Sequence, residues 1–273
     1  MCQYTKGVPG RSQEITGRFL LSVVGKVFER VVADEVCRHL DDNNLLSNQQ
    51  YGFRTGRPTS DLLLLSRDWQ DAQDDGLDTL VVALDIAEAF DRVWHAGFLE
   101  KLHAKDIQGD FFHFLSDYLQ SRTLQVVVNG QTSQAKPMLV SVPQGLVLGP
   151  ILWNLYVDDL LQIVPEIDAY ADDCTLSHSF RHQDGHLVAA ELSQKLNLIK
   201  EWGERWQVNF APEKTQTMIV SRSRLASCEV EGQVRSGDAT LPLQDHIKIL
   251  GVNVDRELRF DLHLQTVPRQ ASL

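Results

Sequence analysis

The sequence predicts a mixed fold, α/β or α+β, with helices packed on a central sheet. Residues 79–85, TLVVALD, form a short, apolar and β-branched run that is typical of a buried strand. Residues 167–179, IDAYADDCTLSHS, predict two short strands around an Asp-Asp turn, and residues 185–206 have the spacing of a long amphipathic helix. Because strand, helix, hairpin, helix and strand follow one another, we expect an antiparallel sheet covered by helices.

The remaining elements follow from apolar spacing and from turn residues. Between Phe19 and Leu40, six apolar residues recur at helical spacing: Val23, Val24, Val27, Phe28, Val31 and Val32. Residues 122–133, RTLQVVVNGQTS, predict a hairpin with its turn at Asn129-Gly130. Further helices are expected over residues 60–73, 88–104, 110–120 and 150–163, and late strands over residues 217–221 and 247–254.

The composition is that of a globular chain of 273 residues, enough for one large domain or two small ones. A hydrophobic fraction of 43% and a charged fraction of 23% allow a sizeable core and argue against global disorder. The four cysteines form no CxxC pair, which predicts a reduced, intracellular protein of the nucleus or cytoplasm. No run of about 18 apolar residues is present, so we expect no membrane span.

The charge balance counts against extensive phosphate contact. The formal net charge is −11, whereas nucleic-acid binding normally uses clustered Lys and Arg. Residues 1–60 hold eight Lys and Arg against six Asp and Glu, a net of +2, and the remaining residues have a net of −13. Any basic surface is therefore local. Carboxylates that bind metal also count as negative charge until the metal arrives.

Three aspartates carry the chemistry that the sequence suggests. Asp172 and Asp173 share the tip of a tight turn, where their like charges repel unless a cation lies between them. Hard oxygen ligands of this kind suit Mg²⁺. Asp85 ends the buried strand, and sites in open sheets tend to lie at such strand ends. If the two strands are neighbours, Asp85 and Asp172 can share two metal ions about 3.5–4 Å apart.

Each of these patterns has a simpler structural explanation. An Asp-Asp turn can be an exposed turn without a ligand. Asp85 can be the N-cap of the helix that follows it. Asp158 and Asp159 form a second Asp-Asp pair after an apolar helix, and there we expect a helix cap or a solvated turn rather than a metal site.

Seven segments follow one another over residues 18–255. They are LLSVVGKVFERVVADEV, LLSNQQYGFRTGRPTSDLLL, LVVALDIAEAFDRVWHAGFLEKL, SVPQGLVLGPILWNLYVDDL, AYADDCTLS, FAPEKTQTMIVSR and ILGVNVD. In this order they resemble the reverse transcriptase domain of non-LTR retrotransposons of the jockey or CR1 kind, the last five as its motifs A to E. The resemblance implies an α+β fold, the fingers and palm of a right-hand polymerase. It also implies an RNA-directed DNA polymerase that uses two Mg²⁺ or Mn²⁺ ions.

The resemblance implies a role for each matching position of the metal site. Asp85 and Asp172 would hold both ions, and Asp173 would support them as the second acid of its pair. Ile86 would contribute its backbone carbonyl to the metal. Lys214 matches the lysine of motif D, a candidate proton donor to pyrophosphate, although a solvated loop lysine is its simpler alternative.

The resemblance also implies a nucleotide-binding set. Phe90 lies where the family places an aromatic steric gate against the 2′-hydroxyl of an incoming ribonucleotide, and its alternative is a core phenylalanine. Gln144 and Gly145 would line the nucleotide and template pocket, where glycine lets the backbone approach the substrate closely. Arg18 would meet the triphosphate, although the proline that usually follows it in the family is missing here.

Contacts with the template and primer would come from two further pairs. Arg54 and Arg57 would meet the template or the triphosphate, because the planar guanidinium group binds phosphate bidentately. Their alternative is that of exposed loop charges. Leu250 and Gly251 would belong to the primer grip. The partners implied are an RNA template, a DNA primer, a dNTP and the endonuclease and thumb regions of a parent element protein.

Residues 1–13 are rich in Gly, Pro, Ser and Gln and are expected to form a disordered leader. The resemblance divides the rest of the chain into fingers and palm (14–255) and the start of a thumb or tail (256–273). Because no complete thumb follows and no endonuclease precedes, we expect a fragment of a larger protein. An active RNA-directed DNA polymerase is the favoured function, and a catalytically inactive remnant that binds nucleic acid weakly is the alternative. Another two-metal palm enzyme, such as a nucleotide cyclase, is disfavoured by the GFR-GR loop and the VPQG segment, because a cyclase needs no template contact.

Overall fold

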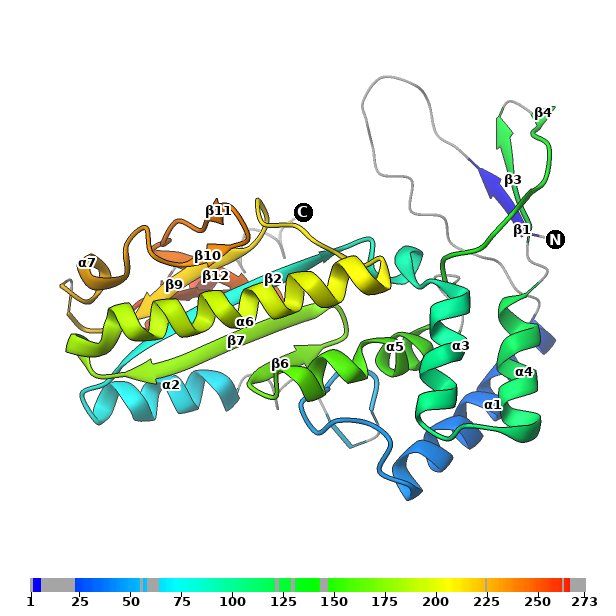
Figure 1. Ribbon diagram of the computed structural model, residues 1–273, viewed down its shortest axis with the longest axis horizontal. Coiled ribbons are helices and arrows are strands. Elements are labelled where there is room, and N and C mark those ends of the chain that lie inside the picture. Colours follow the sequence, from blue (N-terminus) through cyan, green and yellow to red (C-terminus); the bar gives the residue numbers. More distant parts are fainter. Residues whose placement is uncertain are drawn as a thin grey trace. The chain divides into compact units, whose positions relative to one another are not determined.

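The computed structural model of the chain divides into two compact units (Figure 1). It describes residues 2–5, 23–54, 56–57, 64–120, 123–128, 131–142, 147–223, 225–261 and 263–265. The first unit comprises residues 1–46 and 88–157, and the second comprises residues 47–87 and 158–273. None of the helices among the described residues is both long and apolar enough to cross a membrane.

The second unit is built on a five-stranded antiparallel sheet with β2 (Asp78–Ala87) at its centre. β7 (Asp173–Phe180) pairs with one edge of β2, and β6 (Ile167–Tyr170) pairs with β7. The other edge of β2 pairs with β9 (Gln216–Val220) and, near its C-terminal end, with β8 (Asn209–Phe210). Leu80, Val81 and Val82 are fully buried, which explains the continuous apolar run of this strand.

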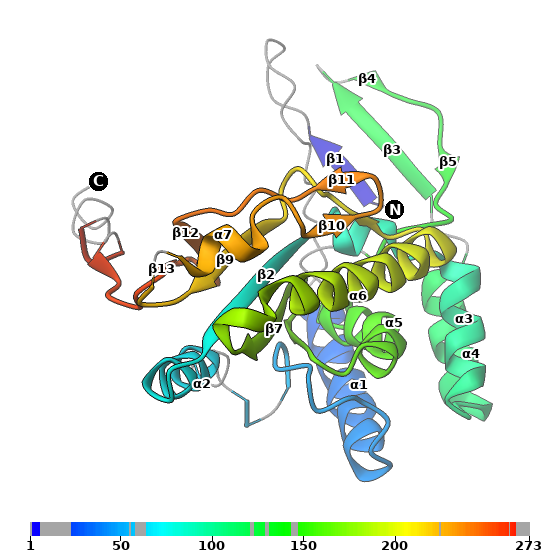
Figure 2. The same cartoon turned by 60° about the vertical axis from the view of Figure 1, so that its left-hand side comes forward.

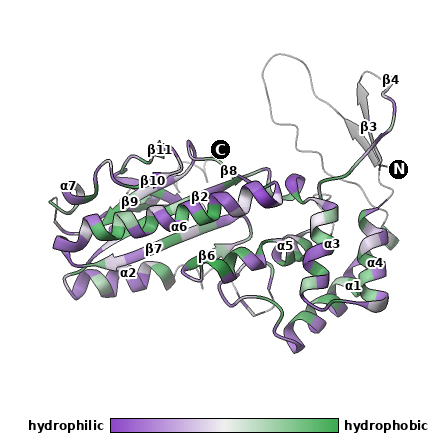
Figure 3. Cartoon of the chain, viewed as in Figure 1, coloured by the Kyte–Doolittle hydropathy of each residue, from purple (hydrophilic) through white to green (hydrophobic). Residues whose placement is uncertain are grey.

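Two helices pack on this sheet. α6 (Gly185–Trp206) contacts β7 and β8 and buries apolar residues spaced by three and four, among them Val188, Leu192, Leu196 and Ile199. In Figure 3 this helix carries both apolar and polar colours, as expected when one side faces the sheet. α2 (Leu64–Asp74) contacts β2, and its Trp69 enters the core beside Val81 and Met218. The predicted antiparallel sheet covered by helices is therefore confirmed.

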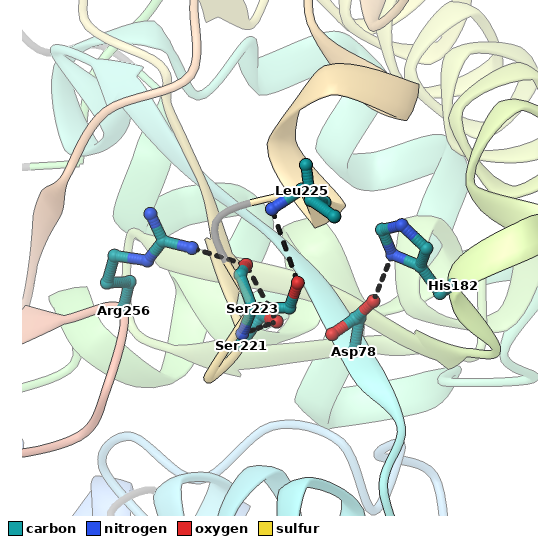
Figure 4. Close-up of polar contacts among 6 residues, drawn as sticks. All are labelled: Asp78, His182, Ser221, Ser223, Leu225 and Arg256. Carbon is teal, nitrogen blue, oxygen red and sulfur yellow. Dashed lines mark hydrogen bonds and ion pairs between the residues drawn. The ribbon is translucent and has the colours of Figure 1, made fainter.

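Several small elements complete the second unit, most of them labelled in Figure 2. They are η3 (His182–Asp184), α7 (Ala226–Val230), the hairpin of β10 (Arg235–Ser236) and β11 (Ala239–Thr240), and the hairpin of β12 (His246–Ile249) and β13 (Val252–Asp255). Figure 4 shows two polar ties there. His182 Nδ1 lies 3.1 Å from Asp78 Oδ2 at the start of β2. Arg256 Nη2 donates to the Ser223 carbonyl over 2.6 Å, which fixes the chain after β9 to the chain after β13.

The first unit is mainly helical. It holds α1 (Val23–Asp42), η2 (Ala89–Arg92), α3 (His95–Ala104), α4 (Gly109–Leu119) and the start of α5 (Gly149–Ile163), within which the division falls. Its sheet consists of β1 (Cys2–Thr5), β3 (Thr123–Val128), β4 (Gln131–Thr132) and β5 (Lys136–Pro137). The antiparallel pairing of β3 with β4 confirms the predicted hairpin.

Three expectations need correction in the first unit. Within residues 1–13, expected to be a disordered leader, Cys2–Thr5 form β1 and pair in parallel with β3, whereas the other residues of this range lie outside the described part of the chain. The helix expected over residues 88–104 is broken at Val93, whose backbone is extended. At this break the chain pairs with the segment that contains Leu139: the His95 N–H donates to the Leu139 carbonyl over 3.2 Å.

The third correction concerns α1, which forms as predicted but buries a different face. The apolar stripe that predicted it is largely exposed: Val23, Val24, Val27, Phe28 and Val31 are each at least 60% exposed. The buried side is formed by Glu29, Ala33, Val36 and Leu40. Glu29 is buried because its carboxylate accepts hydrogen bonds from Tyr118 Oη and from the backbone N–H of Val147. Periodicity thus predicted the helix correctly, whereas the face that packs is not the apolar stripe that indicated it.

Candidate active site

The pairing of β2 with β7 brings Asp85 and Asp173 opposite one another. The register runs without a break from the pair Asp78–Phe180 to the pair Asp85–Asp173. Residues directly opposite in an antiparallel pair point to the same side of the sheet, with Cβ atoms about 4.5–5.5 Å apart. The two carboxyl groups therefore project side by side at the end of the two central strands.

Asp172 lies in the two-residue turn that joins β6 to β7. Tyr170 pairs with Asp173, so Ala171 and Asp172 alone form the turn. Ala171 has a φ of 60°, and it is the only one of the two with a positive φ. This is the pattern of a type II′ turn, which ordinarily has glycine at its first position. A buried alanine in this conformation is strained, so the surrounding contacts must hold the turn.

Lys214 reaches the acids from the loop between β8 and β9. Its Nζ lies 3.4 Å from Asp85 Oδ2, and both side chains are about half exposed. The loop is fixed to the end of β2, because the Ala211 N–H donates to the Asp85 carbonyl over 3.3 Å. The Lys214 N–H then donates to the Ala211 carbonyl over 3.0 Å. The lysine that the resemblance implied is therefore held beside the acid of β2.

A hollow of about 260 Å³ opens beside these residues. It is lined by Ala83, Leu84, Asp85, Asp173, Cys174, Thr175, Lys214, Gln216, Lys248 and Ile249. Gln216 and Lys248 are site residues that the sequence did not predict. Lys248 is exposed on β12 between the buried residues Ile247 and Ile249, and its N–H donates to Gln216 Oε1 over 2.8 Å. The alternation of apolar and polar residues in this strand is the signal that could have identified Lys248.

The electrostatics of the site favour a cation. Burial raises the pKa of Asp172 above its ordinary value, and the negative charge of Asp85 adds to the shift. Burial and the charges of Asp172 and Asp85 likewise raise the pKa of Asp173, against the opposing effect of Lys248. Behind them, burial and both aspartates raise the pKa of Cys174 to about 12. The site is therefore short of positive charge even with two lysines beside it.

The donor set fits a hard divalent cation such as Mg²⁺ or Mn²⁺. Three carboxyl groups lie at one strand end and one turn, and carboxylate oxygen is the ligand such ions prefer. Among the described residues, however, no three His, Cys, Asp or Glu side chains already converge on one point as metal ligands do. Lys214 instead lies close to Asp85 as a counter-ion. Metal binding here would require the carboxyl groups to turn towards a common centre.

Comparison with known proteins decides the family. A model of the family "Reverse transcriptase (RNA-dependent DNA polymerase)" matches residues 14–254. The chain belongs to the reverse transcriptase family. It is 30% identical to "Probable RNA-directed DNA polymerase from transposon BS" of Drosophila melanogaster, over 96% of this chain and 30% of that protein. It is also 30% identical to "RNA-directed DNA polymerase from mobile element jockey" of the same organism, over 91% of this chain and 27% of that protein.

These relatives confirm the predicted resemblance to non-LTR retrotransposons, and the chain spans about 30% of their length. Among solved structures, telomerase from Candida tropicalis in complex with the TWJ fragment of telomeric RNA gives a TM-score of 0.57 at 12% identity. That match covers 85% of this chain and 36% of the telomerase chain. The apo telomerase truncated from its C-terminal domain gives a TM-score of 0.55. The fingers-palm fold class predicted from the sequence is thereby confirmed.

The other residues that the reverse transcriptase resemblance implied are distributed as follows. Ile86 is buried in β2 and pairs with Phe210 of β8. Phe90 lies on η2 in the first unit, half-buried, with its ring centroid 5.9 Å from that of Trp153. Arg18, Gln144 and Gly145 lie outside the described residues.

Arg54 and Arg57 both bind the backbone or side chains of residues 47–51, in their own loop. Arg54 Nη1 donates to the Ser47 carbonyl over 2.7 Å. Arg57 donates from Nη1 to the Asn48 carbonyl and from Nη2 to Asn48 Oδ1, the latter over 2.9 Å, and its guanidinium lies over the Tyr51 ring. Contact of either arginine with a nucleic acid or a triphosphate stays a prediction.

Leu250 and Gly251 form the two-residue turn between β12 and β13. Ile249 pairs with Val252, and both turn residues have positive φ, 47° and 81°. This is the pattern of a type I′ hairpin turn, which suits glycine at its second position. Their role in holding a primer stays a prediction.

The second Asp-Asp pair was expected to be a helix cap or a solvated turn, and this expectation is wrong. Asp158 and Asp159 lie inside α5, and Asp158 is fully buried. Asp158 accepts a hydrogen bond from the Ser47 N–H over 2.5 Å, and Asp159 accepts one from Trp202 Nε1 over 3.0 Å. These acids therefore fix loops and helices of the second unit, which explains their place in an otherwise apolar helix.

Proposed function

We propose that this chain is the catalytic part of an RNA-directed DNA polymerase that extends a DNA primer on an RNA template with two divalent ions. One observation carries the proposal. Asp85 lies opposite Asp173 on paired strands, with Asp172 in the adjoining turn and Lys214 Nζ 3.4 Å from Asp85. The printed names of the relatives describe the same activity for those longer proteins.

In this proposal the three aspartates supply the oxygens that hold two ions of Mg²⁺ or Mn²⁺. Such ions, when bound, activate the attacking oxygen and stabilise the leaving one. Asp85 and Asp172 hold both ions, Asp173 supports them, and the Ile86 carbonyl adds a neutral oxygen. Asp85 and Asp173 line the hollow that Lys214 and Lys248 also line, so a triphosphate there would meet positive charge.

Lys214 would act on the leaving group. Its ammonium is placed beside the acid of β2 by the turn from Ala211, and it lines the same hollow. A proton donated from Lys214 Nζ to the pyrophosphate oxygen would neutralise charge as the bond to the α-phosphate breaks. When the ions bind, Asp85 would exchange its contact with Lys214 for the metal, and the ammonium would be free to face the phosphates.

The remaining substrate contacts belong to the same proposal. Phe90 would exclude ribonucleotides, Arg54 and Arg57 would meet the template or the triphosphate, and Leu250 with Gly251 would touch the primer. Gln144, Gly145 and Arg18 would complete the nucleotide pocket. The dNTP, the RNA template, the DNA primer and the endonuclease and thumb regions of a parent protein are the proposed partners.

The proposal is tested by primer extension on poly(rA)/oligo(dT) with dTTP and either Mg²⁺ or Mn²⁺. Wild-type chain should extend the primer, and Asp172→Asn should not. Asp75→Asn, which changes an exposed acid in the turn before β2, is the matched control and should retain the wild-type rate. Absence of extension by well-folded wild-type chain in both metals would favour the alternative, a remnant without catalytic activity.

A further inference from the structure

We propose that Gln50 is a positioning residue that holds the turn of the catalytic acids, an inference that rests on the proposed function. Gln50 is 1% exposed. Its Oε1 accepts two backbone hydrogen bonds, one from the Ala171 N–H over 3.1 Å and one from the Gly52 N–H over 3.0 Å. A single side-chain oxygen thus joins the loop of residues 47–54 to the residue before Asp172.

The backbone around Gln50 adds to this contact. The Tyr51 N–H donates to the Ala169 carbonyl over 2.8 Å, and the Ala169 N–H donates to the Gln49 carbonyl over 2.8 Å. These bonds form an isolated parallel bridge between Gln50 and Ala169. The loop therefore continues the sheet beyond β6, on the edge of the strand that leads into the catalytic turn.

Gly52 allows the close approach. A Cβ atom at Gly52 would lie 2.4 Å from the Ala171 backbone nitrogen, a distance that packed atoms do not adopt. The loop backbone thus lies directly against the turn. Gly52 has no positive φ, so space rather than backbone conformation requires glycine at this position.

The turn needs such support because Ala171 is strained. Its φ of 60° is unfavourable for an alanine, and its N–H is buried with the Gln50 oxygen as acceptor. Without this acceptor the turn would relax towards other backbone angles, and Asp172 and Asp173 would leave their orientation beside Asp85. An error of about 1 Å in such positions can lower a catalytic rate about 100-fold.

The contact also links two parts of the proposed site. The loop that carries Gln50 continues to Arg54 and Arg57, the residues proposed to meet the template or the triphosphate. Because Gln50 Oε1 ties this loop to the turn, movement of one is transmitted to the other. Gln50 Nε2 has no hydrogen-bond partner among the described residues, so the acceptor oxygen of the amide, rather than its donor, makes these contacts.

The experiment compares Gln50→Met with Gln49→Met in the full chain. Gln49 is the adjacent residue of the same type, and its Oε1 accepts from Ser47 Oγ rather than from the turn. We expect Gln50→Met to lower kcat for dTTP incorporation about 10- to 100-fold with little change in KM, and Gln49→Met to leave both unchanged. Gln50→Glu keeps the acceptor oxygen and should recover part of kcat. Gly52→Ala should lower kcat independently.

Hydrogen exchange gives a second readout that needs no activity. The amide of Ala171 should exchange about tenfold faster in Gln50→Met than in wild type, and at the wild-type rate in Gln49→Met. Unchanged exchange, or a kcat equal to that of wild type in folded Gln50→Met, would overturn the inference. If wild-type chain is inactive while exchange still rises in Gln50→Met, the proposed function fails and the structural link between loop and turn stands.

Discussion

Lys214 Nζ lies 3.4 Å from Asp85 Oδ2, so the acid that ends the central strand already has a counter-ion. If Lys214 serves the leaving pyrophosphate, Lys214→Met should lower kcat about 100-fold, the lower range for loss of a general acid. Stability should change little, because both side chains are about half exposed. Rapid-quench measurement of dTTP incorporation checks this. The matched control is Lys200→Met on α6, whose ammonium lies 3.8 Å from Glu204, and an equal loss in both variants would reject the role.

Metal binding should reverse the destabilising effect of the clustered acids. The pKa values of Asp172 and Asp173 are raised in the folded chain, so the folded chain binds their protons more tightly than the unfolded chain does. The free energy of unfolding therefore falls as the pH rises above the ordinary pKa of aspartate and these protons are lost. At pH 8 without metal, Asp172→Asn should therefore melt at a higher temperature than wild type. With millimolar Mn²⁺ the wild-type chain should gain stability by selective binding to the native state, and Asp172→Asn should gain much less. Equal Mn²⁺-induced shifts would place the metal elsewhere.

The raised pKa of Asp168 predicts a second pH dependence of stability, separate from that of the turn that carries Asp172. Burial raises its pKa to about 6, and the charge of Asp68 adds to the effect, while a hydrogen bond from Tyr51 opposes it. The folded chain holds this proton more tightly than the unfolded chain, so the free energy of unfolding falls as the pH rises from about 4 through 6. Asp168→Asn should be more stable at pH 8, by at most about 3 kcal/mol, and should lose that advantage below pH 4. Urea unfolding across this range checks it, and a constant difference would contradict the prediction.

Two roles of Phe90 can be told apart by substitution: a steric gate that excludes ribonucleotides, and a core residue that only stabilises the fold. Phe90→Val should raise incorporation of UTP relative to dTTP, because a smaller side chain leaves volume for the 2′-hydroxyl. Phe114→Val is the matched control, since Phe114 is another half-buried phenylalanine of the first unit, 6.3 Å from the Phe28 ring. A core role would instead lower the melting temperature with no change in the ratio of the two rates.

The sequence predicted the centre of the second unit well because its signals are local. The apolar run before Asp85 and the Asp-Asp turn define β2 and the β6–β7 hairpin, and these strands pair with the acids at one end. Lys214 was placed only by resemblance, and the structure brings it to Asp85. For β2 and for the β6–β7 hairpin, a short segment of sequence contains the information that fixes the element.

What the sequence did not predict depends on contacts between distant residues. Gln50 and Ala171 are 121 residues apart, and nothing near Gln50 indicates that its side chain would support the turn. Spacing predicted α1 but not its packed side, because periodicity does not show which face finds a partner. The burial of Asp158 also depends on a distant contact, because the acid accepts from the Ser47 N–H 111 residues away.

In the proposed function, Asp85 and Asp172 act in one metal-dependent site. The most direct measurement is the single-turnover rate of the first dTMP addition with saturating template-primer and Mn²⁺, for wild type, Asp85→Asn, Asp172→Asn and the double variant. Residues that act as a unit are strongly non-additive. We therefore expect each single change to lower the rate at least about 1,000-fold, and the double change to lower it little further. A rate in Asp85→Asn within about tenfold of wild type, or losses that multiply in the double variant, would contradict a shared site.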